Sequence, residues 1–192
     1  MREELEKEFV RKSIHLTGIS VPLFYIFFQR DLTILYTAMA LLVFVVLEYV
    51  RVRVHSLFPL PRMASMIQRM KERTAIAANV YFCVAAVVSI YFFKEFSVVV
   101  GLSTALLSDA AAAIIGTGIG RHRLKNGKSW EGTAAGGLSA FFISLSLGGS
   151  LIVSIVLGFV FCLIDLIDFG FDDNFIMPLL MVMVVELGGS LL

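Results

Sequence analysis

Long uncharged apolar segments, separated by short charged connections, constrain this sequence more than any other feature. Residues 74–93 and 132–164 contain no charged side chain. About 20 mostly apolar residues are enough for one helical crossing of a bilayer. Only 16% of the 192 residues are charged, against about 25% in soluble domains, so too little polar surface remains for a water-exposed globule. The sequence therefore predicts an all-α, polytopic integral membrane protein, with residues 1–192 forming one domain.

The uncharged segment 132–164 is too long for a single span. As one helix it would measure about 50 Å, against a hydrocarbon core of about 30 Å. Gly148, Gly149 and Ser150 near its middle predict a turn. With that break we expect seven transmembrane helices, and without it six. The predicted segments are residues 13–29, 32–47, 74–93, 96–120, the two halves of 132–164, and 175–192.

Lysine and arginine residues are concentrated in alternate connections between these segments. The N-terminal region, the second connection and the fourth connection together hold 14 of the 16 basic residues. The positive-inside rule assigns such connections to the cytoplasm. We therefore expect a protein of the cell membrane with a cytoplasmic N-terminus. With seven helices, the acidic turn at residues 168–174 also faces the cytoplasm, whereas with six it faces outward. The basic residues form no long tract, so no nucleic-acid partner is predicted.

Three polar clusters near the predicted inner ends of the helices need an explanation, because ionisable groups in membrane spans are costly. The first consists of Arg11, Lys12 and His15, whose spacing places them on one helical face. Three donors there could hold an anionic phosphate group. Positive-inside anchoring, together with one hydrogen-bonded histidine, explains the same residues without a ligand, and the spacing alone slightly favours it.

The second cluster lies around a glycine-rich turn between two apolar segments. Its members are Asp109, Gly116, Gly118, Gly120, Arg121, Lys128, Ser129, Glu131 and Gly132. Glycines let the backbone approach a ligand closely, and Ser129 is expected to cap a helix whose N-terminus favours anions. These residues predict a phosphate cradle, with Asp109 and Glu131 as ligands for Mg²⁺. Close helix packing through the small residues is an alternative explanation for the glycines.

The third cluster is acidic and precedes the last apolar segment. It contains Asp165, Asp168, Asp172, Asp173 and Asn174. Asp172, Asp173 and Asn174 before Pro178 fit turn chemistry and a helix cap. They fit a second set of metal ligands or a catalytic base equally well, and the sequence does not decide between these roles.

Four sequence blocks in this chain resemble those of the dolichol kinase and phytol kinase group. They are RKSIHLTG at residues 11–18, KERTAIAANVYF at 71–82, DAAAAIIGTGIGRHRL with KSWEGT at 109–133, and FDDNFIMPLL at 171–180. The third block is similar to the cytidine-nucleotide-binding segment that this group shares with phosphatidate cytidylyltransferases and archaeal CDP-lipid synthases. Ser108 stands where the pattern usually has glycine, and Asp165 where it usually has glutamate. Neither departure removes a charge, but both weaken assignment to a subfamily.

The resemblance implies a CTP-dependent kinase that phosphorylates a membrane lipid alcohol, such as dolichol or another polyprenol, with Mg²⁺ as cofactor. The residues then expected to bind nucleotide and phosphate are Arg11, Lys12, Gly116, Gly120, Arg121, Lys128, Ser129, Gly132 and Asn174. Those expected to act in catalysis are His15, Asp109, Asp172 and Asp173, with Asp109, Glu131 and Asp173 as metal ligands. Asp109 or Asp172 would accept the alcohol proton.

Two other functions fit parts of the same pattern. A phosphatidate cytidylyltransferase would use the same cradle, release pyrophosphate and form a CDP-lipid, although the Arg-Lys-x-x-His block favours the kinase branch. A small transporter with Asp109 as a proton or ion site fits less well, because it predicts polar groups on both membrane faces. The sequence identifies neither the lipid alcohol nor the oligomeric state, and no residue visibly distinguishes CTP from ATP.

Overall fold

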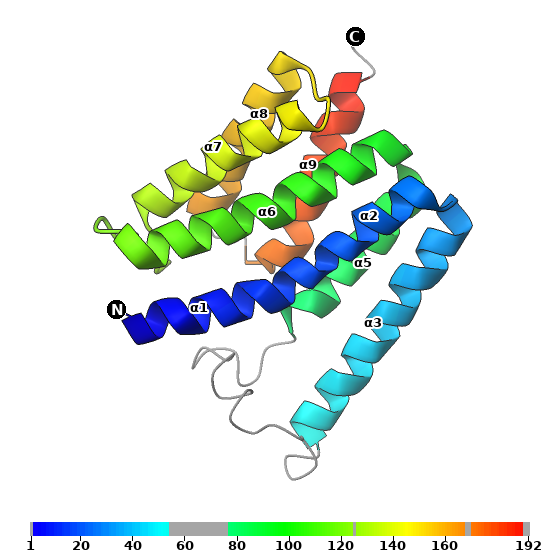
Figure 1. The fold of residues 1–192 in the computed structure, drawn as a ribbon, viewed down its shortest axis with the longest axis horizontal. Helices are drawn as coiled ribbons and strands as arrows, with labels where there is room; N and C mark the ends of the chain where they lie inside the picture. Colours follow the sequence, from blue (N-terminus) through cyan, green and yellow to red (C-terminus); the bar gives the residue numbers. More distant parts are fainter. Residues whose placement is uncertain (1, 54–76, 125, 168–169, 190–192) are drawn as a thin grey trace.

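The described part of the chain is built from helices, as the sequence predicts. A computed structural model describes residues 2–53, 77–124, 126–167 and 170–189. Its helices are α1 (Arg2–His15), η1 (Leu16–Ile19), α2 (Ser20–Phe27), α3 (Arg30–Arg53), α5 (Ala78–Phe92), α6 (Glu95–Ile119), α7 (Trp130–Ser146), α8 (Leu151–Leu166) and α9 (Asp173–Gly189). In these residues the β-type pairing is limited to one bridge between Arg123 and Ser129. The predicted all-α class is confirmed (Figure 1).

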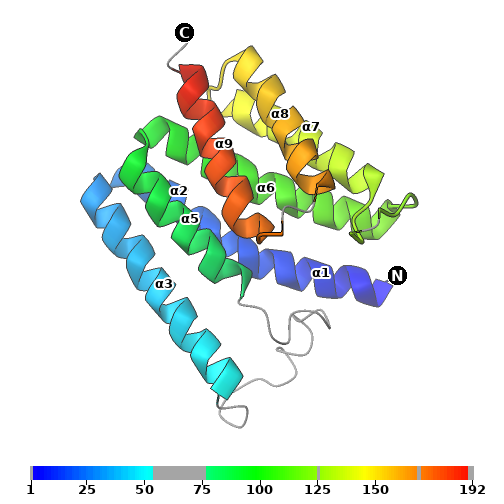
Figure 2. The same cartoon turned by 180° about the vertical axis from the view of Figure 1, so that it is seen from behind.

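The predicted break in segment 132–164 is also confirmed. α7 ends at Ser146, and Gly148 has a φ of 91°. Residues with a side chain rarely adopt such a positive φ, so glycine is favoured at this position. Ser150 then caps α8, because its hydroxyl accepts the backbone N–H of Val153 at 3.3 Å. The segment therefore forms two helices that lie side by side (Figures 1 and 2).

The first predicted segment, residues 13–29, is not one regular α-helix. The 3₁₀ turn η1 separates α1 from α2. Pro22 in α2 has no N–H and cannot donate to the carbonyl of Gly18, so the helical hydrogen-bond pattern is interrupted there. Gly18 also lies close to α5, since a Cβ atom on it would be 2.8 Å from the Phe82 ring. The start of segment 74–93 lies outside the described residues, as does Asp168.

α6 occupies the centre of the bundle. It contacts α1, α2, α5, α7 and α9, an arrangement visible from both sides (Figures 1 and 2). One buried cluster, including Leu157, Phe161 and Met181, joins α6 to α8 and α9. A second, including Phe82 and Leu102, joins α6 to α5. The carboxyl-terminal half of α6 runs between α1 on one side and α7 on the other (Figure 1).

Within the described residues, two helices are long and apolar enough to cross a membrane. They are Arg30–Val50 within α3 and Glu95–Ile119, with mean hydropathies of 2.1 and 2.0. α5 and α8 are apolar but shorter. α3 lies at the edge of the bundle and exposes Leu35, Met39 and Leu42 by 56%, 61% and 63%. At this coarse level the structure supports the predicted membrane character.

Connections between helices gather at two opposite ends of the bundle. At one of them, here called the far end, Arg30 donates to the Phe93 carbonyl at 3.0 Å, and the Lys94 N–H donates to Glu186 at 3.1 Å. The opposite end, here called the cleft end, contains the α6–α7 loop and the start of α9 (Figure 2). Successive connections thus lie at opposite ends of the bundle, which agrees with the predicted grouping of the polar clusters on one side.

Candidate active site

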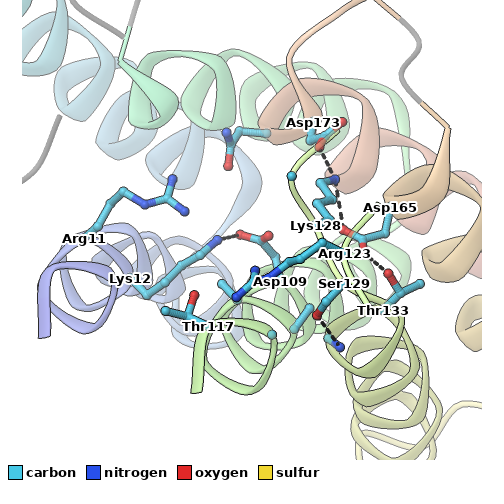
Figure 3. A pocket seen from close by; sticks show the side chains of 16 residues that line it. Arg11, Lys12, Asp109, Thr117, Arg123, Lys128, Ser129, Thr133, Asp165 and Asp173 are labelled. Carbon is cyan, nitrogen blue, oxygen red and sulfur yellow. Dashed lines mark hydrogen bonds and ion pairs between the residues drawn. The ribbon is translucent and has the colours of Figure 1, made fainter. Parts of the chain in front are cut away.

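A polar cleft of about 140 Å³ opens at the cleft end of the bundle (Figure 3). All three predicted clusters contribute to its walls. The lining residues are Arg11, Lys12, Asp109, Ala112, Ala113, Gly116, Thr117, Arg123, Gly127, Lys128, Ser129, Gly132, Thr133, Asp165, Asp173 and Asn174. Four basic side chains thus face three carboxylates in one small space, a composition suited to a polyanionic ligand.

Lys12 and Asp109 form an ion pair across one wall of the cleft. Lys12 Nζ donates to Asp109 Oδ2, and the two residues are 97 positions apart in the sequence. Only 4% of Lys12 is exposed, so its charge requires a partner. His15 lies one helical turn further on, with Nε2 3.7 Å from the same oxygen. Arg11 also lines the cleft, and its Nη2 lies 2.5 Å from Glu8 Oε1.

Lys128 extends from the α6–α7 loop to a pair of carboxylates on the opposite wall. Its Nζ lies 2.6 Å from Asp173 Oδ2 and 2.9 Å from Asp165 Oδ1. Asp165 is 4% exposed and also accepts the Thr133 hydroxyl at 2.5 Å. Burial by itself lowers the pKa of an ammonium group, but Asp165 and Asp173 outweigh it and raise the pKa of Lys128. Lys128 therefore stays charged near neutral pH and connects the loop to α8 and α9.

The N-terminus of α7 opens onto the cleft, and Ser129 caps it as predicted. The Ser129 hydroxyl accepts the backbone N–H of Gly132 at 3.1 Å. The preceding loop is a tight hairpin, in which the Leu124 N–H donates to the Lys128 carbonyl at 2.8 Å and Gly127 has a φ of 84°. The positive end of the helix dipole favours an anion at such a helix start.

The glycines of the second cluster bring α6 and α7 into close contact. A Cβ atom on Gly116 would lie 2.9 Å from Ser129 Oγ, and one on Gly132 would lie 2.7 Å from the Ala112 carbonyl oxygen. At Gly120 it would lie 2.8 Å from Ser129 Cβ. The packing explanation therefore accounts for Gly116, Gly120 and Gly132, whereas Gly118 faces Leu5 of α1. Gly116 and Gly132 line the cleft as well, whereas Gly120 does not.

Arg121 and Glu131 lie outside the cleft lining. Glu131 faces His122, whose ring Nδ1 is 2.7 Å from Glu131 Oε1 and whose backbone N–H donates to the same carboxylate. Its own backbone N–H and the His122 ring lower the pKa of Glu131 to about 2. Glu131 therefore holds the α6–α7 loop against the start of α7. The structure does not place it beside Asp109 and Asp173, so it is not positioned as a metal ligand with them. Arg123 lines the cleft where the sequence alone suggested Arg121.

The two neighbouring aspartates of the third cluster have different surroundings. Asp172 lies outside the cleft lining, and its Oδ1 accepts the backbone N–H of Asn174 at 2.9 Å and the Asn174 Nδ2 at 2.7 Å. This is the predicted turn chemistry. Asp173 and Asn174 line the cleft. Burial raises the pKa of Asp173 above its usual value, assisted by the charges of Asp109 and Asp165 and opposed by Lys128.

Four polar side chains in the cleft are absent from the sequence-based site, namely Thr117, Arg123, Thr133 and Asp165. Asp165 carries a signal, because a carboxylate at the end of an apolar helix needs a partner. Thr117 and Thr133 carry none, since hydroxyls are common in apolar helices and often bond to their own backbone. Arg123 differs from Arg121 only in the direction that the loop gives its side chain.

Magnesium fits this cleft through very few protein ligands. No group of three or more His, Cys, Asp or Glu side chains that could hold a metal occurs among the described residues. Mg²⁺ commonly binds through one or two carboxylates and completes its shell with substrate phosphates and water. Asp109, which lines the cleft and whose side chain is 25% exposed, meets that requirement.

Comparison with known proteins identifies a family for this chain. No family model matches it, and no solved structure matches it. A protein of Rickettsia prowazekii (strain Madrid E), described as uncharacterized protein RP860, is 30% identical over 153 residues. The match covers 74% of this chain and 72% of the relative. The chain therefore belongs to the same family as this Rickettsia protein.

Proposed function

We propose that the protein is a CTP-dependent kinase that phosphorylates a membrane lipid alcohol of the dolichol or polyprenol type. The observation that carries this proposal is the convergence of three family-like sequence blocks on one cleft. Lys12 comes from the first block, Lys128 and Ser129 from the block at residues 109–133, and Asp173 from the last. Because these residues are far apart in the chain, their common position supports a shared role in binding phosphate.

Basic groups on two walls would hold the triphosphate. Lys128, Arg123 and the N-terminus of α7 lie on one wall, and Arg11 and Lys12 on the other. Ammonium and guanidinium groups donate strong hydrogen bonds to phosphate oxygens, and the positive end of the α7 dipole adds to their attraction for phosphate. Arg123 takes the role that the sequence alone assigns to Arg121.

The transfer itself would proceed by direct attack of the alcohol on the nucleotide. The alcohol oxygen forms a bond to the γ-phosphorus, and the bond from that phosphorus to the β–γ bridging oxygen breaks, so that CDP leaves with the electron pair. Asp173 would accept the hydroxyl proton, because it lines the cleft and burial raises its pKa. When the nucleotide binds, Lys128 would pair with a phosphate in place of Asp173. The Asp173 carboxylate would thereby become available as a base.

Asp109 would hold Mg²⁺ together with the nucleotide phosphates. The ion, when bound, neutralises phosphate charge during transfer. Lys12 contacts Asp109 and keeps its carboxylate at the cleft wall. Arg11 and Lys12 would also offset the charge of the phosphoryl group. Phosphoryl transfer depends mainly on positioning and electrostatic stabilisation, and these side chains provide the types of chemical group that such a reaction requires.

A seven-span arrangement in the cell membrane, with the cleft at the cytoplasmic face, belongs to the same proposal. Two long apolar helices and the exposed apolar surface of α3 support a bilayer environment. The cleft is lined by four basic side chains, those of Arg11, Lys12, Arg123 and Lys128, and this concentration supports a cytoplasmic cleft. The lipid chain would remain in the bilayer, while its hydroxyl group reaches the cleft at the interface.

Product analysis tests this function. Purified full-length protein in lipid nanodiscs would be supplied with labelled CTP or ATP, Mg²⁺ and a panel of lipid alcohols. The proposal predicts CDP and a phosphorylated lipid. Pyrophosphate and a CDP-lipid formed from phosphatidate would instead identify a cytidylyltransferase. Absence of any nucleotide turnover across the panel would refute both enzymatic functions.

A further inference from the structure

The two carboxylates that share Lys128 differ in their exposure to solvent. The Asp165 side chain is 6% exposed, whereas the Asp173 side chain is 36% exposed. Lys128 Nζ is within hydrogen-bonding distance of both, at 2.9 Å from Asp165 Oδ1 and 2.6 Å from Asp173 Oδ2. Figure 3 shows the lysine between them. Lys128 therefore has one buried partner, near the end of α8, and one partly exposed partner, at the start of α9.

Asp165 is held in place by a second side chain. Its Oδ2 accepts the hydroxyl of Thr133, which lies in α7 and is 2% exposed. Both oxygens of the buried carboxylate are thus engaged, one by Lys128 and the other by Thr133. Because α7 and α8 pack against each other, Asp165 offers Lys128 a partner whose position is fixed by the helices.

The backbones of Asp165 and Lys128 are also connected, through the side chain of Asn126. Asn126 Nδ2 donates to the Asp165 carbonyl at 3.2 Å, and Asn126 Oδ1 accepts the backbone N–H of Lys128 at 3.1 Å. The Asp165 carbonyl belongs to the last turn of α8, where carbonyl groups lack a partner within the helix. Asn126 lies outside the cleft lining, so it joins Lys128 to Asp165 from behind the site.

These surroundings determine which partner Lys128 gives up when a phosphate group enters the cleft. Separation from Asp165 would leave an uncompensated charge in a buried position, which is strongly unfavourable. Separation from Asp173 would leave a partly exposed carboxylate, and the pairing of exposed groups contributes little to stability. The lower cost is therefore to release Asp173 and to keep Asp165.

We propose that Asp165 is a positioning residue that keeps Lys128 when the nucleotide binds, so that the lysine leaves Asp173 and this carboxylate becomes free to act as the base. The proposal rests on the kinase function proposed above and explains how binding of the phosphate donor would prepare the base. An ammonium group has three hydrogen-bond donors, so Lys128 can hold Asp165 and a phosphate oxygen at the same time. Asp165 would thus act through Lys128.

Asp165→Asn tests this role, because asparagine has a similar shape and can still accept the Thr133 hydroxyl. Without the buried charge, Lys128 should remain on Asp173. At saturating CTP and with the most active alcohol of the lipid panel, kcat should then fall by about tenfold or more, since a general base contributes about 100-fold or more. The KM for CTP should stay at the wild-type value or fall, because the substitution removes a negative charge from the cleft.

A second substitution distinguishes a positioning role from a structural one. In Lys128→Gln no lysine remains to cover Asp173, so adding Asp165→Asn should lower kcat no further. A carboxylate that only stabilised the end of α8 would lower kcat equally in both backgrounds, because the effects of independent sites add. Asp165→Glu keeps the charge and should therefore retain more of the wild-type kcat than Asp165→Asn.

Asp31→Asn is the matched control, because it neutralises an aspartate in the first turn of α3, at the far end of the bundle. It should leave kcat at the wild-type value. Asn126→Ala breaks the link between Lys128 and Asp165 without changing any charge or any residue of the cleft lining. It should lower kcat by a smaller factor than Asp165→Asn, which provides a second test if Asp165→Asn does not fold.

Equilibrium binding of CTP to the wild-type protein separates the two levels of the proposal. Protein that neither binds CTP nor phosphorylates an alcohol would overturn the kinase function and the role of Asp165 together. With an active wild-type enzyme, the role of Asp165 alone would be overturned by wild-type kcat in Asp165→Asn, by a raised KM for CTP in that variant, or by an equal loss of kcat in the Lys128→Gln background. If Asp165→Asn does not fold, wild-type kcat in Asn126→Ala would have the same consequence.

Discussion

The two ends of the bundle use the same kind of charged pair in different surroundings. At the far end, Lys94 Nζ lies 3.4 Å from Glu186 Oε1, and the lysine side chain is 74% exposed. At the cleft end, the Lys12 side chain is 5% exposed and Lys128 is shared between Asp165 and Asp173. Exposed pairs contribute little to stability, and buried pairs are often no better than apolar residues. The buried charges of the cleft end are therefore better explained by function than by folding.

Loss of the Asp109 carboxylate should have the largest effect. If Asp109 holds Mg²⁺ and the nucleotide, Asp109→Asn should lower kcat by about a thousandfold or more, as for other groups that neutralise transferred phosphate. Glu186→Gln at the far end should leave kcat near the wild-type value. Lipid phosphorylation measured at saturating CTP checks both variants. Equal activity losses in the two would contradict the distinction between the ends.

Folding must be controlled in this comparison, because Asp109→Asn leaves the buried Lys12 without a charged partner. The double variant Lys12→Met/Asp109→Asn removes both charges and should restore thermal stability without restoring kcat. Recovery of activity in the double variant would show that Asp109 acts through Lys12 and not on the nucleotide.

Neutralising one lysine at each end should have the next largest effect. Lys128→Gln should lower kcat/KM for CTP by about 10- to 100-fold, since a hydrogen bond to a charged group contributes about 1.5–3 kcal/mol. Lys94→Gln should have no comparable effect, because Lys94 lies far from the cleft and is largely exposed. Steady-state kinetics with varied CTP would measure the difference. A similar KM for CTP in the two variants would show that Lys128 is not part of the proposed phosphate site.

The pH dependence of kcat/KM should show a smaller effect of the same lysine. Asp173 must be deprotonated to accept a proton, and burial raises its pKa, so activity should fall on acidification at a pH above the usual aspartate value. Lys128 opposes that shift. Its removal in Lys128→Gln should raise the pKa of Asp173 further and move the acidic limb to higher pH. In Lys94→Gln the acidic limb of the kcat/KM profile should stay where it is in the wild type. If it also stays in place in Lys128→Gln, that result would argue against Asp173 as the base.

The smallest expected effect concerns stability at the far end. A double-mutant cycle with Lys94→Ala and Glu186→Gln should give a coupling free energy below about 1 kcal/mol, as for other exposed pairs. Unfolding in nanodiscs or mild detergent would measure it. A coupling several times larger would mean that the far end also contains a buried electrostatic network.

Most of the fold follows from the sequence because the bilayer constraint is strong. The helix break at Gly148 is predictable, since an uncharged run of that length cannot form one span and glycine tolerates the positive φ. The 3₁₀ turn η1, which interrupts the first predicted helix, was not predictable from the sequence in this way. The η1 turn depends on Pro22 and on the close contact of Gly18 with Phe82, which is a tertiary contact.

The site was predictable as clusters but not as individual contacts. Asp109, Lys128 and Asp173 lie together as the grouping of polar clusters predicts. The roles of Glu131 and Asp172 depend on short-range hydrogen bonds, to His122 and Asn174, that the turn geometry creates. These bonds exclude both carboxylates from the cleft lining. Side-chain direction in a loop of a few residues is not encoded by any periodic pattern.

The separation of Lys12 and Asp109 by 97 positions has a consequence for biosynthesis. A ribosome releases Lys12 long before Asp109, and the Asp173 partner of Lys128 appears 45 positions after it. During translation the early basic residues therefore have no acidic partner from these later helices. The cleft can assemble only when α9 has left the ribosome, so premature release of the nascent chain would leave the cleft without the wall that Asp173 and Asn174 form.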